Sequence, residues 1–141
     1  MNMMKMMKLT VATMILAGSY AAMAKETVDT SKLPPASDKK DVTFAADIKP
    51  LFDRSCVGCH GMEKQKAKLR LDSLEAVLKG GHDGKVVMPG DSAKSSLVLS
   101  VAHLGNDPDT YMPKAPKGKK AESLTAAQIG LIRAWIDQGA K

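Results

Sequence analysis

Two cysteines and a histidine stand together in the segment RSCVGCHG, residues 54–61, and these side chains offer the most distinctive chemistry in the sequence. Cys56 and Cys59 are the only two cysteines in the chain, and His60 follows the second one directly. Residues three and four apart share one face of a helical turn, so the three side chains are expected to lie close together. Cys-x-x-Cys-His is the attachment signature of c-type haem, in which the thiols form thioethers with the haem and the histidine binds its iron.

Three other interpretations of the cysteine pair are weaker. A thioredoxin-like redox motif is expected near a βαβ pattern, which the sequence lacks. A structural zinc site needs four ligands, and without a second cysteine pair His82 and His103 would have to complete it. A disulfide between the two cysteines would close a very short loop and add little stability. One covalently bound haem c, held by Cys56, Cys59 and His60, is therefore the predicted cofactor.

The sixth coordination position of haem iron distinguishes electron transfer from ligand binding or peroxide chemistry. A methionine there raises the reduction potential and closes the iron to substrates. Met112 is the leading candidate because it lies in a long loop just before the last predicted helix. Met88 is its rival, since a proline follows both methionines, and His103 and His82 are further alternatives.

The N-terminus predicts an exported protein. Lys5 and Lys8 precede an apolar run over residues 9–17, and residues 22–24 form a small-x-small cleavage site, so residues 1–24 are predicted to be a signal peptide. The apolar run is shorter than the ~20 residues that a membrane-spanning helix needs. We therefore expect cleavage after residue 24, no stable membrane insertion afterwards, and a periplasmic location.

The charge of the chain is modestly positive. The sequence has 21 basic and 15 acidic residues, and cleavage after residue 24 would leave 19 and 15, a net charge of +4. Without interleaved aromatic residues this charge does not predict a nucleic-acid partner. It is compatible with steering toward an acidic redox partner protein. Two basic clusters border the candidate ligand segments: Lys64, Lys66, Lys68 and Arg70, and Lys114, Lys117, Lys119 and Lys120.

Short helices are the elements expected to position these residues. Residues 25–41 are polar and contain two adjacent prolines, which predicts a flexible linker ahead of a domain over residues 42–141. The apolar spacing of residues 43–55 predicts a helix leading into Cys56, which Pro50 should kink or restart. Shorter helices are predicted over residues 73–79 and from Ser95 or Ser96 onward.

The last predicted helix is the best defined. Thr125 is expected as its N-cap, with Gln128 completing a capping box and Gly139 ending the helix. Its predicted apolar face consists of Ile129, Ile132, Trp135 and Ile136.

Residues 44–141 resemble the planctomycete-type cytochrome c domain of the class I cytochrome c superfamily. The matching segments are residues 47–52, 56–61, 64–66, 69–73, 89–91, 103, 107–109, 112–113 and 131–140. The resemblance implies an all-α class I cytochrome c fold, with three to five short helices around one covalently bound haem. It also implies that the helix leading to Cys56 packs against the helix bearing Trp135, and that His60 and Met112 are the axial ligands. The chain departs from the family at Met62 and Met88, where a proline and an aliphatic residue are usual.

The function expected from these observations is that of a periplasmic monohaem c-type cytochrome, which transfers single electrons between redox proteins and is not an enzyme. One alternative is a haem enzyme or small-ligand sensor with a vacant or labile sixth iron site. Another is a haem-bearing assembly module whose main role is protein interaction.

Overall fold

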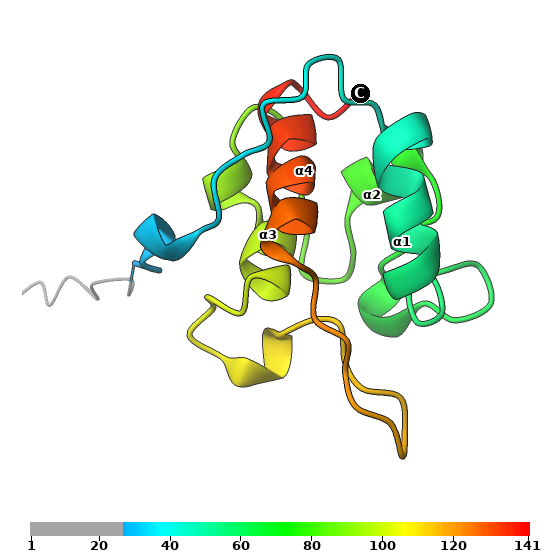
Figure 1. Ribbon diagram of the computed structural model, residues 1–141. Coiled ribbons are helices and arrows are strands. Elements are labelled where there is room, and N and C mark those ends of the chain that lie inside the picture. The colour runs from blue at the N-terminus through cyan, green and yellow to red at the C-terminus, as the bar shows by residue number, and fades with distance from the viewer. Residues whose placement is uncertain (1–26) are drawn as a thin grey trace, which may run out of the picture.

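The computed structural model describes residues 27–141, so the predicted signal peptide lies outside the described residues. Within the described part the chain is helical and forms no strand, only two isolated bridges, His60 to Gln65 and Gly81 to Gly84 (Figure 1). The prediction of an all-α protein is thereby confirmed. None of the helices in this part of the chain has the length and apolar character to cross a membrane.

Four α-helices are present in residues 27–141: α1 (Lys49–Ser55), α2 (Leu74–Lys79), α3 (Ser96–Val101) and α4 (Ala126–Asp137). Shorter helical turns precede α1 at Thr30–Lys32 and Phe44–Ile48 and lie between the α-helices at Lys66–Lys68, Ser92–Lys94 and Pro108–Thr110. Figure 1 shows α4 in the middle of the molecule, with α1 to one side of it.

The segment before the cysteines forms two joined helical pieces. A π-helical turn over Phe44–Ile48 is followed at once by α1, and Pro50 lies in the first turn of α1. Because proline has no backbone N–H, it is tolerated where a helix begins. The prediction that Pro50 restarts the helix is confirmed. The amide of Cys56 still donates to the carbonyl of Phe52 at 2.8 Å, so α1 leads directly into the cysteine motif.

Helix α4 has the N-terminal cap that the sequence predicts. The Thr125 side chain accepts from the backbone N–H of Gln128, and the Gln128 side chain accepts from the backbone N–H of Thr125. Gly139, just beyond the helix, has φ +101°, which a residue without Cβ adopts most readily. The predicted apolar face is buried: Ile129, Ile132, Trp135 and Ile136.

Three aromatic side chains join the N-terminal helical segment to α4. The ring centroids of Phe44 and Trp135 lie 5.8 Å apart. The Phe52 ring packs edge to face against Trp135, with a centroid distance of 6.5 Å. The Trp135 indole N–H donates to the carbonyl of Lys141 at 2.9 Å, which satisfies its polar edge. The expected packing of the helix before Cys56 against the helix bearing Trp135 is therefore present.

The segment ahead of the first helix is attached to α4. Leu33 is buried, the Ser37 amide donates to the carbonyl of Gly130 at 2.9 Å, and the Gln138 side chain donates to the carbonyl of Lys39 at 2.8 Å. These contacts differ from the flexible linker expected over residues 25–41, because the packed structure begins at Leu33. Backbone groups make most of these contacts, so the apolar pattern of the sequence does not reveal them.

The start of α3 differs from the prediction in one detail. Ser95 is its N-cap residue, but the Ser95 side chain does not cap the helix. Its hydroxyl instead donates to the carbonyl of Asp91 and accepts from the amide of Met88, both at 2.9 Å. The buried hydroxyl thus ties the turn that carries Met88 to the beginning of α3.

Candidate functional site

The cysteine motif forms one helical turn at the end of α1. The amides of Cys59 and His60 both donate to the carbonyl of Cys56 at 3.0 Å. Both cysteines are half-buried free thiols. The turn expected from the spacing of the three residues is therefore present, and the two thiols are not joined in a disulfide.

The environment of Cys56 disfavours two of the alternative roles. Burial raises the pKa of the Cys56 thiol to about 11, so this thiol stays protonated near neutral pH. Thiol–disulfide exchange and disulfide formation proceed through the thiolate. Among residues 27–141 no group of three histidine, cysteine or acidic side chains is arranged to hold a metal ion. The motif thus lacks a zinc ligand set, whereas haem c is held at separate points, two on its edge and one at its iron.

The imidazole of His60 is oriented by backbone carbonyls. His60 is buried, and its Nδ1 lies 3.1 Å from the carbonyl oxygen of Lys66 and 3.3 Å from that of Leu69. A carbonyl only accepts, so Nδ1 carries the hydrogen and Nε2 keeps its lone pair. Among the described residues no fully buried side-chain nitrogen or oxygen lacks a hydrogen-bond partner, so Nε2, which makes no hydrogen bond, keeps some solvent exposure. This tautomer and orientation fit a histidine that binds iron through Nε2.

The segment that orients His60 is itself fixed. The amide of Leu71 donates to the carbonyl of His60 at 2.8 Å. Arg70 donates through two nitrogens to the carboxylate of Asp72, at 3.0 and 2.7 Å, and this hydrogen bonding lowers the pKa of Asp72. Sequence reasoning did not identify Lys66 and Leu69 as supports of His60, because they act through backbone oxygens that every residue possesses.

The two candidate methionines lie in different surroundings. Met112 is half-buried and packs against the hydrophobic core, and its amide donates to the carbonyl of Ser100 at 3.1 Å. The side chain of Met88 is 43% exposed. Of the two histidine alternatives, His82 is exposed and lies 2.8 Å from Asp83, whereas His103 is half-buried beside Met112.

A cavity of about 310 Å³ lies between the segment that follows the cysteine motif and α3, and none of Cys56, Cys59, His60 and Met112 lines it. Ala67 and Leu69, from the segment after His60, line one part of it, and Ser100, whose carbonyl accepts from the Met112 amide, lines another part. Val86 and Leu99 contribute apolar surface, and His82, Asp83 and Lys85 contribute polar or charged groups. A larger hollow of about 680 Å³ borders the cysteine motif at Val57 and Gly58, and most of its other lining residues are charged: Lys49, Asp53, Glu63, Lys64 and Asp72.

An all-helical domain that presents Cys-x-x-Cys-His at the end of its first α-helix has the features of a cytochrome c-type protein. Residues 56–116 match the family model described as Planctomycete cytochrome C. The match begins at Cys56 and includes His60 and Met112, and it confirms the family resemblance drawn from the sequence. No curated protein and no solved structure gives a significant match to the chain. The family match indicates a haem protein.

Proposed function

We propose that this chain is an exported monohaem cytochrome c with the class I fold, which carries single electrons between redox proteins. The observation that supports the proposal most strongly is the state of His60, whose Nδ1 is fixed by two carbonyls while Nε2 is free. In this proposal Cys56 and Cys59 anchor one haem, and His60 and Met112 are its two axial ligands.

The residues of the site would have distinct tasks. Bound haem supplies a one-electron iron couple, whose potential depends on the axial ligands. The two cysteines hold the group covalently, and the hydrogen bonds to Lys66 and Leu69 keep His60 in one orientation. Apolar residues such as Leu69 and Val86 would limit the access of water. Outer-sphere electron transfer makes and breaks no substrate bond, so no residue is assigned a catalytic role.

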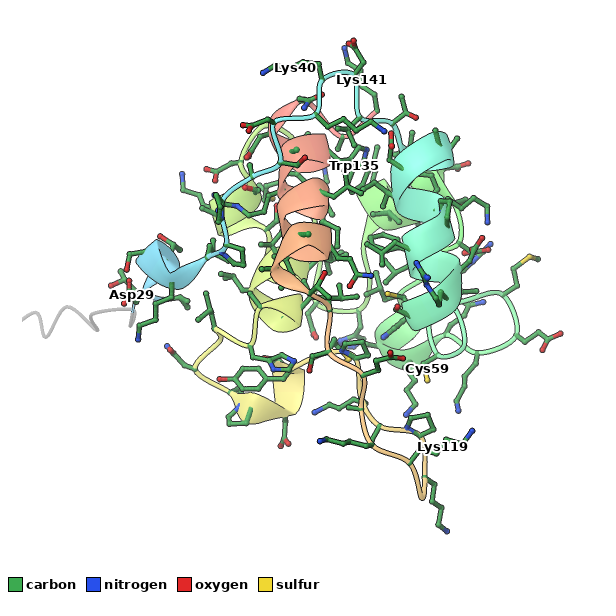
Figure 2. The ribbon with its side chains drawn as sticks, in the orientation of Figure 1. Asp29, Lys40, Cys59, Lys119, Trp135 and Lys141 are labelled. Atoms are coloured by element: carbon green, nitrogen blue, oxygen red, sulfur yellow. The ribbon has the colours of Figure 1, made fainter. Side chains whose placement is uncertain are left out.

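Export is part of the same proposal. Residues 1–24 would direct the chain to the periplasm, where an acidic redox partner would approach the lysines of the loop after Met112. These lysines, Lys114, Lys117, Lys119 and Lys120, are all exposed. In Figure 2 Lys119 and Cys59 lie toward the same end of the molecule, which agrees with docking near the haem attachment site.

The second candidate function is that of a haem enzyme or small-ligand sensor with a labile sixth site. One observation favours it: Met112 is only half-buried, and residues 114–120 after it are exposed. Carbon monoxide binding by the reduced protein separates the two functions, because a firmly bound methionine excludes the gas and a labile one does not.

Mass spectrometry under denaturing conditions tests covalent attachment of one haem. In protein produced together with haem-attachment machinery, we expect the mass of the chain plus one haem. Replacing both cysteines, Cys56→Ala with Cys59→Ala, should abolish the added mass, whereas the control His82→Ala should retain it because His82 is exposed. A wild-type chain that carries no covalent haem would refute the proposal.

A further inference from the structure

His103 stands directly after the end of α3. The helix ends at Val101, Ala102 is its C-cap, and His103 has φ +56°. Glycine or asparagine is the usual residue in this left-handed position, because a larger side chain carries a conformational cost there. The contacts of the imidazole can offset this cost.

The imidazole of His103 holds two consecutive residues of the loop. Its Nε2 lies 3.0 Å from the carbonyl oxygen of Met112. Its ring stacks on Tyr111, with centroids 4.9 Å apart and planes 10° from parallel. Because the carbonyl only accepts, Nε2 is the donor. One side chain thus fixes both Tyr111 and the backbone of Met112.

Two further hydrogen bonds complete this arrangement. The amide of Met112 donates to the carbonyl of Ser100 in α3 at 3.1 Å. The Tyr111 hydroxyl donates to the carbonyl of Gly105 at 2.9 Å. Both backbone polar groups of Met112 are therefore bound, one to α3 and the other to His103. The side chain of Met112, in contrast, is not restrained by any hydrogen bond.

We infer that His103 is a positioning residue for the iron-binding side chain of Met112, and this inference rests on the proposed function. His103 would act through the Met112 carbonyl and not on iron, since its Nε2 is already engaged. Fixing the backbone of Met112 before ligation reduces the entropy lost when its thioether binds. A methionine held in this way dissociates less often and keeps small ligands from the iron.

Two substitutions of His103 separate its hydrogen bond from its effect on the turn. His103→Asn retains a residue that adopts the left-handed backbone readily, but it lacks the ring and ends too short to replace Nε2. His103→Gln places an amide N–H near the position of Nε2. His82→Asn is the matched control, because His82 is exposed and contacts Asp83. Each would be studied as the haem-loaded protein, with circular dichroism as a check of folding.

The readouts are the weak far-red absorption band of the oxidised iron–methionine bond and the affinity of the reduced protein for carbon monoxide. We expect His103→Asn to weaken the band and to raise the affinity about tenfold, the scale of one lost hydrogen bond. His103→Gln should restore part of both properties, and His82→Asn should match wild type. Tyr111→Leu, which removes the stacking partner and the hydroxyl bonded to Gly105 but keeps the imidazole of His103, should change both readouts in the same direction and to a smaller extent.

Wild-type band intensity and carbon monoxide affinity in folded His103→Asn would overturn the inference. If that variant does not fold, unchanged readouts in Tyr111→Leu would overturn it. A wild-type protein that lacks the band or binds carbon monoxide readily would instead contradict the assignment of Met112 itself. The failure of the proposed function is thus distinguishable from the failure of the His103 inference.

Discussion

At the scale of single residues, the two predicted axial ligands are held in different ways. His60 is buried, and two carbonyls restrain its ring directly. Met112 is half-buried, and hydrogen bonds restrain its backbone but not its thioether. Ligand exchange at the proposed site should therefore occur on the Met112 side, and the His60 side should stay bound.

Replacing the predicted sixth ligand tests this difference. We expect Met112→Ala to lower the reduction potential by on the order of 0.1 V, within the roughly 0.8 V range that axial ligands span. The loss of a thioether that favours ferrous iron is the cause, and it should also allow carbon monoxide to bind. Potentiometric titration and gas binding measure the two effects. Met88→Ala is the control, because Met88 is 43% exposed, and the reverse pattern would assign the sixth position to Met88.

The sequence predicts the reactive groups of the site better than their supports. Cys56, Cys59 and His60 are recognisable because their types and spacing are rare. The carbonyls of Lys66 and Leu69 cannot be recognised in the sequence, because every residue has a carbonyl and their positions depend on how the chain after His60 folds back. The contacts of His103 are equally hidden, because they depend on the path of the loop rather than on residue type.

At the scale of elements, α4 supports the molecule on more than one side. Its Trp135 packs against Phe44 and Phe52, and its Gly130 receives the segment ahead of the first helix. A Cβ built on Gly130 would lie 2.5 Å from the carbonyl oxygen of Pro35. This close approach explains a glycine inside a helix, where it otherwise reduces stability.

Gly130→Ala should therefore destabilise the protein. Alanine in an exposed helix interior adds about 1 kcal/mol of stability relative to glycine, whereas overpacking costs about 1–3 kcal/mol. We expect a net loss of about 1 kcal/mol in the free energy of unfolding, measured by chemical denaturation of the haem-loaded protein. Ala127→Gly, at an exposed position of α4, is the control: it measures the difference in helix stability between alanine and glycine without a packing contribution. A gain of stability in Gly130→Ala would show that the contact with Pro35 is unimportant.

The elements themselves were predictable to different degrees. The capping box of Thr125 and Gln128 and the restart at Pro50 follow from local chemistry, and both predictions are confirmed. The docking of residues 33–41 on α4 was not predictable, because it depends on backbone hydrogen bonds and on the single buried apolar side chain of Leu33. Composition alone made this segment resemble a linker.

At the scale of the whole molecule, the positive charge near the proposed haem site is the property that a partner would meet first. In Figure 2 Lys119 lies toward the end of the molecule that carries Cys59, while Lys40 and Lys141 lie at the opposite end. The long-range attraction between two proteins depends on the net charge of each and also on where the charged residues lie relative to the docking surface. These lysines therefore allow charge position to be tested at constant net charge.

The rate of electron transfer to a small anionic redox complex tests this distribution. We expect Lys117→Gln with Lys119→Gln to lower the rate roughly two- to fivefold at low ionic strength, because two attractive charges near the haem edge are lost. Lys40→Gln with Lys141→Gln removes the same charge at the far end and should have a smaller effect. Added salt should reduce the difference by screening. Equal rates in the two double variants, or a wild-type rate indifferent to salt, would exclude electrostatic docking at this end.

The visible absorption spectrum of the haem-loaded protein, oxidised and then reduced, tests the central claim most directly. If His60 and Met112 bind the haem iron, we expect the reduced protein to give a c-type haem spectrum. The oxidised protein should show the weak far-red band of an iron–methionine bond. A c-type spectrum without that band would contradict the claim, since the sixth position would then be open or held by another ligand.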